Sequence, residues 1–136
     1  MPNPLDADYG GIVALRGYQL AASTVSQGGT LRLSLYWQGE KPTSTNYTVF
    51  VHVADDQNRK AGQHDGQPRD GEHPTSIWRP GELVEDRVDV PIALDAPPGR
   101  YRVVVGVYDL ATMQRLPLAG GGDSLTLAIV TVQPAG

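Results

Sequence analysis

Ionisable side chains that could bind a metal or move a proton are concentrated between positions 52 and 73. The set comprises His52, Asp55, Asp56, His64, Asp65, Asp70, Glu72 and His73. Imidazole and carboxylate groups are common ligands of divalent metals, so a metal site would draw on His52, His64, Asp65 and His73. These residues lack the HExxH spacing that brings two histidines together on one helix face. A metal-dependent enzyme that uses these four residues is one hypothesis, without a motif to support it.

Two other interpretations account for the same polar cluster. In the first, residues 55–74 form a solvated loop in which aspartate and glycine residues make turns. Residues 55–60 lack the glycine and the terminal glutamate of an EF-hand loop. In the second, part of the cluster is a hydrogen-bonded network, because buried polar groups need partners. Asp65 would then accept hydrogen bonds from backbone N–H groups, and His52 would hold its strand against the loop.

Hydrolytic chemistry has little support in the sequence. Two carboxylates among Asp65, Asp70 and Asp86 could serve a glycosidase only if the fold placed them about 5–10 Å apart. No Gly-x-Ser-x-Gly motif is present for a serine nucleophile, and the chain has no cysteine. We therefore expect a domain without catalytic residues and without a cofactor.

Aromatic residues outside the predicted core could bind a sugar, because the C–H face of a pyranose ring is apolar and its rim is polar. Trp78 precedes Arg79 in a loop-like segment, and Tyr108 falls on the more polar phase of its strand. Together with two residues of the polar cluster they form the candidate ligand-binding set, which is Trp78, Arg79, His52, Asp65 and Tyr108. The competing interpretation of Trp78 is a plug over one end of the fold.

The composition limits the possible partners. The formal net charge is −4 with only 11 lysines and arginines, whereas nucleic-acid binding needs a concentrated basic patch. No apolar run approaches the roughly 18 residues of a membrane span, so we expect no membrane insertion by this segment. The first residues show no basic region followed by an apolar one, so no signal peptide is predicted. A chain of 136 residues can bury a core without disulfides.

Alternating side chains predict that strands position these residues. Residues 31, 33, 35 and 37 are apolar and point one way, while the residues between them point the other. Further strands are predicted over residues 11–20, 47–54, 83–92, 101–109 and 125–132, with a short extended piece at 61–64. Glycine and proline fall between these segments as turn residues.

The strand pattern predicts an all-β fold. We expect an antiparallel two-sheet β-sandwich of the immunoglobulin or fibronectin III type with seven to nine strands. One domain would cover residues 11–133, with a leader or linker remnant at 1–10 and a tail at 134–136. Tyr101 follows Pro98 and Gly99, where such sandwiches place a tyrosine corner, whose hydroxyl bonds to upstream backbone.

Three stretches, in order, resemble a known family. They are residues 49–55 (VFVHVAD), residues 63–68 with 74–82 (QHDGQP and PTSIWRPGE), and residues 97–101 with 108–109 and 115–117 (PPGRY, YD and RLP). This set resembles the C-terminal β-sandwich domain appended to bacterial membrane glycosyltransferases of the dolichyl-phosphate-mannose mannosyltransferase type. The hairpin after Asp109 usually carries a glycine in that family where Met113 stands here.

The resemblance implies an extracytoplasmic, non-catalytic accessory domain. Such a domain would position a glycan, or contact the membrane part of its parent protein, where the transferase active site would lie. A structural or protein-interaction module without a ligand is the alternative. That module would show an apolar surface patch or an exposed sheet edge in place of an aromatic binding site.

Overall fold

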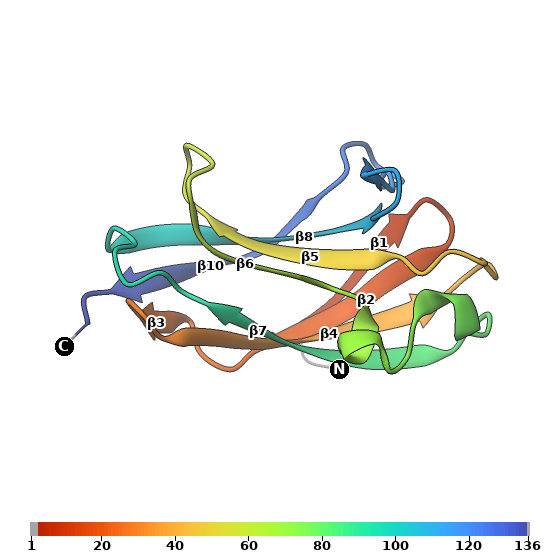
Figure 1. Ribbon diagram of the computed structural model, residues 1–136, viewed down its shortest axis with the longest axis horizontal. Helices are drawn as coiled ribbons and strands as arrows, with labels where there is room; N and C mark the ends of the chain where they lie inside the picture. The colour runs from red at the N-terminus through yellow and green to blue at the C-terminus, as the bar shows by residue number, and fades with distance from the viewer. Residues whose placement is uncertain (1–2, 136) are drawn as a thin grey trace.

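Two β-sheets pack face to face in the computed structural model, which describes residues 3–135 (Figure 1). The first sheet has four strands, in the order β1 (Pro4–Tyr9), β2 (Val13–Leu20), β4 (Thr30–Gly39) and β7 (Leu83–Pro91). The second sheet has the order β3 (Thr24–Ser26), β10 (Leu125–Gln133), β8 (Gly99–Asp109), β5 (Thr48–Ala54) and β6 (Lys60–Gly66). Its sixth strand, β9 (Gln114–Arg115), pairs with β8.

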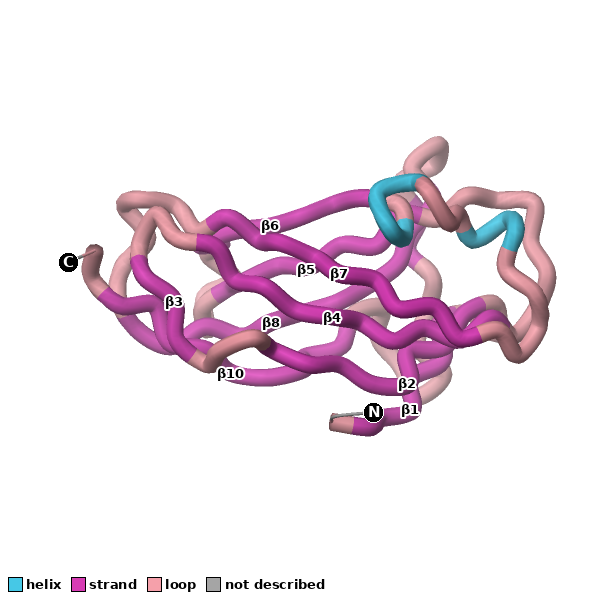
Figure 2. The backbone as a smooth tube through the Cα atoms, turned by 90° about the horizontal axis from the view of Figure 1, so that it is seen from below, coloured by secondary structure: helices cyan, strands magenta, loops and turns pink. Residues whose placement is uncertain are grey.

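Apolar side chains from alternate strand positions fill the space between the sheets. The four inward residues of β4 are each at most 4% exposed; they are Leu31, Leu33, Leu35 and Trp37. The valines at positions 103, 105 and 107 of β8 are fully buried opposite them. The predicted β-sandwich is therefore confirmed, and Figure 2 shows the strands of both sheets running along the long axis of the molecule.

The predicted tyrosine corner is present at the start of β8. The hydroxyl of Tyr101 donates a 2.6 Å hydrogen bond to the carbonyl oxygen of Pro97. Gly99 between them has a φ of 148°, which residues with a side chain rarely adopt. The corner ties the 97–99 turn to the central strand of the six-stranded sheet.

The strand count and direction differ from the prediction. Residues 3–135 contain ten strands rather than seven to nine, because β3 and β9 have only three and two residues. Elements this short show no alternation in a sequence. β3 pairs with β10 in parallel, so one pair departs from the antiparallel arrangement.

The segment predicted as a leader or linker remnant at 1–10 belongs to the sandwich from residue 4 onward. Residues 4–9 form β1, and Tyr9 is fully buried with its hydroxyl donating a 2.8 Å hydrogen bond to the carbonyl oxygen of Val105. That bond joins the two sheets. Residues 1–2 and 136, at the ends of the predicted leader and tail, lie outside the described residues.

The polar segment after β5 is more ordered than a solvated loop. Its strand, β6, covers Lys60–Gly66 and pairs with β5, so it is longer than the piece expected at 61–64. Two short 3-10 turns follow, η1 (Pro68–Gly71) and η2 (Thr75–Ile77), at one end of the molecule (Figure 2). Neither helical segment in the described part of the chain has the length or apolar character to cross a membrane.

Candidate binding groove on the outer sheet face

The register of β5, β6 and β8 brings polar and aromatic side chains to the outer face of the six-stranded sheet. Phe50 lies opposite Asp65 on β6 and opposite Gly106 on β8, and His52 lies opposite Gln63. Because successive strand residues point to opposite faces, these side chains share the outer face while the valines between them are buried in the sandwich.

Phe50 is 2% exposed although its ring lies on the outside of the sheet. The ring lies over Gly106, where a β-carbon would come within 2.1 Å of its Cζ atom. The guanidinium carbon of Arg115 is 4.5 Å from the ring centroid, and the ring of His52 is also 4.5 Å away. A cation over an aromatic face is attracted by the ring quadrupole. Phe50 therefore forms an apolar base on which Arg115 and His52 are positioned.

A chain of hydrogen bonds crosses the same face. Lys60 Nζ donates to Gln63 Oε1 at 3.1 Å, and Gln63 Nε2 donates to Asp65 Oδ1 at 3.0 Å. The hydroxyl of Tyr108 donates to Asp65 Oδ2 at 2.8 Å. Desolvation, together with the hydrogen bond to Asp65 and its negative charge, raises the pKa of Tyr108 to about 12. The phenol therefore stays protonated and keeps the carboxylate oriented.

The surroundings of His52 lower its pKa and so favour the neutral imidazole. Partial burial lowers its pKa, and the positive charges of Lys60 and Arg115 lower it further, against an opposite effect of Asp65. A neutral imidazole has one nitrogen that donates and one that accepts. His52 can therefore exchange hydrogen bonds with an uncharged hydroxyl group.

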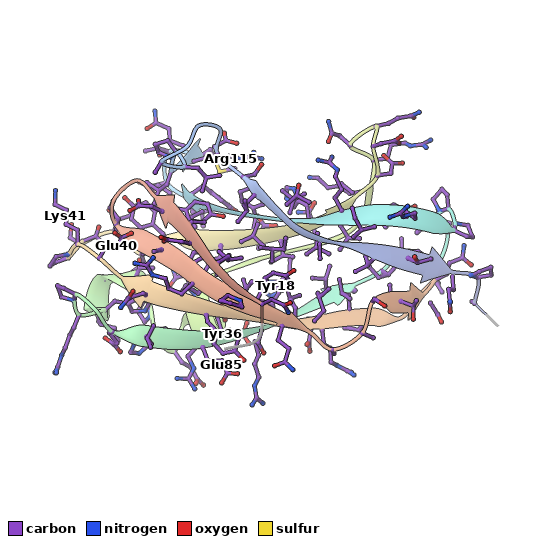
Figure 3. The ribbon with its side chains drawn as sticks, turned by 180° about the vertical axis from the view of Figure 1, so that it is seen from behind. Tyr18, Tyr36, Glu40, Lys41, Glu85 and Arg115 are labelled. Atoms are coloured by element: carbon purple, nitrogen blue, oxygen red, sulfur yellow. The ribbon has the colours of Figure 1, made fainter. Side chains whose placement is uncertain are left out.

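Two adjoining hollows on this face make one open groove, which we call the outer-sheet groove. The first, about 220 Å³, is lined by Phe50, His52, Lys60, Gln63, Asp65, Tyr108, Met113 and Arg115. The second, about 300 Å³, is lined by Phe50, His52, Ala54, Asn58, Lys60, Arg102, Val104, Arg115 and Ser124. The β5–β6 turn and the loop after β9 rise above the sheet on this side (Figure 1). Figure 3 shows Arg115 on this outer face and Glu85 on the opposite side of the molecule.

The fold is shared with the C-terminal domain of Wzt. That domain superposes with a TM-score of 0.66 over 100% of this chain and 84% of its own length, at 13% sequence identity. A β-glucuronidase from glycoside hydrolase family 2 matches 75% of this chain with a TM-score of 0.55 and 13% identity, over 10% of its own length. A Niemann-Pick type C2 protein from the Japanese carpenter ant matches 99% of both chains with a TM-score of 0.55 and 5% identity.

Sequence comparison adds no family to these structural likenesses. No protein-family model matches the chain, and no curated protein is similar to it in sequence. The shared feature with Wzt and the other two proteins is therefore the sandwich itself. The groove has to be interpreted from its own residues.

Three of the five predicted ligand-binding residues come together in the groove, and two do not. His52, Asp65 and Tyr108 line it. Trp78 instead packs into the core, 6% exposed, with its indole N–H donating to the carbonyl oxygen of His73 at 2.9 Å. Arg79 follows it in the exposed turn before β7. The indole is buried there because the end of the sandwich needs an apolar cover, as the plug interpretation of Trp78 predicts.

The structure does not bring the four proposed metal ligands together. His64 and Asp65 are consecutive in β6 and so point to opposite faces of the sheet; Asp65 lines the groove with His52, and His64 does not. His73 lies after η1, where its Nε2 is 2.8 Å from Glu82 Oε2. Within residues 3–135 no group of three or more histidine, aspartate or glutamate side chains is placed to hold a metal ion. The metal-enzyme hypothesis on these four residues is therefore not supported.

The predicted polar network also differs in detail. Asp65 accepts its hydrogen bonds from the side chains of Gln63 and Tyr108 rather than from backbone N–H groups. Asp86, a candidate glycosidase acid, faces the interior at 4% exposure and accepts a 2.8 Å bond from the backbone N–H of Arg69. Asp65 faces outward, so these two carboxylates do not converge.

Several groove residues were not singled out by the sequence. They are Phe50, Lys60, Gln63, Arg102 and Arg115. The alternation of residues 47–54 does place Phe50 and His52 on one face, which is a usable signal. Arg102 belongs to β8 and Arg115 to β9, and only the pairing of β8 with β5 and of β9 with β8 brings them to this face.

Proposed function

We propose that this chain is a non-catalytic accessory domain that binds a glycan in the outer-sheet groove. The observation that carries the proposal is the hydrogen-bonded chain from Lys60 through Gln63 and Asp65 to Tyr108, at the edge of an open hollow. Binding sites for small polar ligands place a few oriented polar groups around an apolar base. Here the buried ring of Phe50 supports Arg115 and His52 from beneath, and the carboxylate, amide and imidazole groups match the hydroxyls of a sugar.

The number of carboxylates that line the groove supports a binding role without catalysis. Asp65 is the single carboxylate among the described residues that line either hollow. Most glycosidases use two carboxyl groups on either side of the scissile bond. The β-glucuronidase with the same sandwich supports the use of this architecture in carbohydrate-active proteins.

We further propose that the domain belongs to an extracytoplasmic part of a membrane glycosyltransferase. Support comes from the motif set that resembles that family. Residues 49–55 cover most of β5, residues 63–68 include the end of β6, and residues 97–109 include β8. These three strands are neighbours in the six-stranded sheet and carry most of the groove.

Titration with sugars tests the proposal. Neutral, uronic and amino oligosaccharides are added to the labelled protein, and backbone amide shifts are followed by NMR. We expect shifts confined to β5, β6, β8 and β9, and at least about tenfold weaker binding for Asp65→Asn, which corresponds to about 1.4 kcal/mol. Asp89→Asn, on the exposed face of the other sheet, is the matched control and should bind normally. The absence of binding by all three sugar classes would refute the proposal.

A protein-interaction module is the second candidate because two exposed apolar side chains lie in one turn, of which Met113 borders the groove. Leu110 and Met113, in the turn between β8 and β9, are 61% and 67% exposed. Self-association measured by light scattering, abolished by Leu110→Ser with Met113→Ser, would favour this role over glycan binding.

A further inference from the structure

In the second hollow of the outer-sheet groove, the charged side chains among the described lining residues are all positive. Lys60, Arg102 and Arg115 border the second hollow, and none of its described lining residues carries a carboxylate. The chain as a whole has a net charge of −4. The three cations around this hollow therefore form a local positive patch on a chain whose net charge is negative.

Two of these cations are not neutralised by an acidic partner. Lys60 bonds to the amide oxygen of Gln63, and Arg102 donates to the carbonyl oxygen of Asp55 and to Asn58 Oδ1 at 2.7 Å. Within residues 3–135, neither forms an ion pair with a carboxylate. Their hydrogen bonds to neutral oxygens fix the side chains without cancelling the charge.

Arg115 is only partly neutralised. Its Nη1 atom is 3.2 Å from Asp123 Oδ1, in a pair whose side chains are 42% and 51% exposed. Ion pairs this exposed are weak and compete with solvent. The guanidinium stays above Phe50 and presents its remaining N–H groups to the groove. The field of Lys60 and Arg115 is also felt by His52, whose pKa they lower.

We propose that the glycan bound here is acidic, with a carboxylate or phosphate substituent held between Lys60, Arg102 and Arg115. The hydroxyls of the same or the next sugar would then be bound by the Gln63, Asp65 and Tyr108 side chains in the other half of the groove. This inference rests on the proposed function and names its ligand class. Guanidinium groups suit both anions because they donate two parallel hydrogen bonds.

An acidic tetrasaccharide, a neutral tetrasaccharide and a phosphorylated monosaccharide test the charge requirement. Tetragalacturonate, mannotetraose and mannose 6-phosphate are titrated by calorimetry and NMR at low salt and at about tenfold higher salt. We expect an acidic ligand to bind at least about tenfold tighter than the neutral one at low salt, and to lose most of that advantage at high salt.

Single variants locate the anion. Lys60→Gln should weaken the acidic ligand about fivefold more than it weakens the neutral ligand, a difference equivalent to about 1 kcal/mol. Lys60 is exposed and bonds only to another surface side chain, so the variant should fold normally. Arg87→Gln, an exposed arginine on the four-stranded sheet, is the charge-matched control and should change nothing.

The outcomes separate this inference from the proposed function. Equal or tighter binding of mannotetraose would overturn the acidic ligand and leave the glycan-binding role in place. Binding of no sugar would overturn the glycan-binding role itself. Acid-selective binding that is unchanged by Lys60→Gln and Arg115→Gln would overturn this site. Inorganic phosphate that binds as tightly as mannose 6-phosphate would overturn the glycan as the ligand of the site.

Discussion

The hydroxyl of Tyr108 donates a 2.8 Å hydrogen bond to Oδ2 of Asp65, and the bond passes over β5, the strand between β8 and β6. Strands two places apart are roughly 10 Å from each other, a distance that a tyrosine side chain helps to span. The bond fixes one oxygen of the carboxylate, while Gln63 fixes the other. Asp65 is therefore oriented before any ligand arrives, which reduces the entropy that binding would cost.

Asp65→Asn should lower the pKa of Tyr108 from about 12. Burial would keep the pKa above its usual value, but the carboxylate's hydrogen bond and negative charge would be gone. An ultraviolet absorbance titration of ionised tyrosine measures the change, and Tyr108→Phe identifies which transition belongs to Tyr108. Titration of Tyr108 at the same pH in both proteins would contradict the pairing.

Gly106→Ala should destabilise the fold by about 1–3 kcal/mol, because the new methyl group overlaps the ring of Phe50. The β-carbon would lie 2.1 and 2.2 Å from the Cζ and Cε2 atoms of that ring. Urea unfolding measures the loss, and Gly106→Ala with Phe50→Val should recover part of it. Gly120→Ala is the control, since nothing lies within 4 Å of its β-carbon. Equal effects of the two single substitutions would show that backbone entropy, rather than the overlap, determines the result.

Met113→Gly should stabilise the fold by about 1 kcal/mol. Met113 has a φ of 61°, in the left-handed region that costs a residue with a side chain about that much. Its side chain is 67% exposed, so little packing is lost. Thermal unfolding measures the gain. Leu110→Gly, in the same turn and similarly exposed but without a positive φ, should destabilise. A lower melting temperature for Met113→Gly would refute the strain argument.

Asp86 should make the protein more stable as the pH falls from about 6 toward 4. Burial raises its pKa from 3.8 to about 6, against weaker opposite effects of the Arg69 backbone N–H and the charge of His64. The folded state therefore binds the proton more tightly than the unfolded state. The resulting stability is complete below pH 3.8 and is lost as the pH rises through about 6.

Asp86→Asn isolates that contribution. The amide keeps an acceptor for the N–H of Arg69 but does not ionise, so the variant should gain up to roughly 3 kcal/mol relative to the parent between acid and neutral pH. Urea unfolding across that pH range measures the free energy of unfolding of both proteins. Subtracting the parent's value from the variant's cancels the contributions of other acids such as Asp55 and Glu82. Asp89→Asn, exposed on the same strand, should follow the parent. If the free energy of unfolding changed with pH in the same way for Asp86→Asn and for the parent, a raised pKa of Asp86 would be excluded.

Local patterns in the chain were sufficient to predict the sandwich and its tyrosine corner. The inward phase of β4 and the bond from Tyr101 to Pro97 depend on residues close in sequence. β1 escaped prediction although Leu5, Ala7 and Tyr9 alternate with Asp6 and Asp8, because this short segment is bordered by proline and glycine residues that are typical of a linker. Trp78 could not be assigned for a related reason: an indole in a loop is equally suited to a surface platform and to a cover over the core.

The sequence by itself determined which residues alternate, and therefore that Phe50 and His52 share a face. Only the tertiary structure determined which side chains neighbour Phe50 and His52. The registers of β6, β8 and β9 bring three further residues to that face, which are Asp65, Arg102 and Arg115. These residues lie up to 65 positions away from Phe50 along the chain. Alternation specifies the side of a strand on which a residue projects. Which strand lies beside it follows from the packing of the whole core, because a one-residue slip in register would send each of these side chains into the interior.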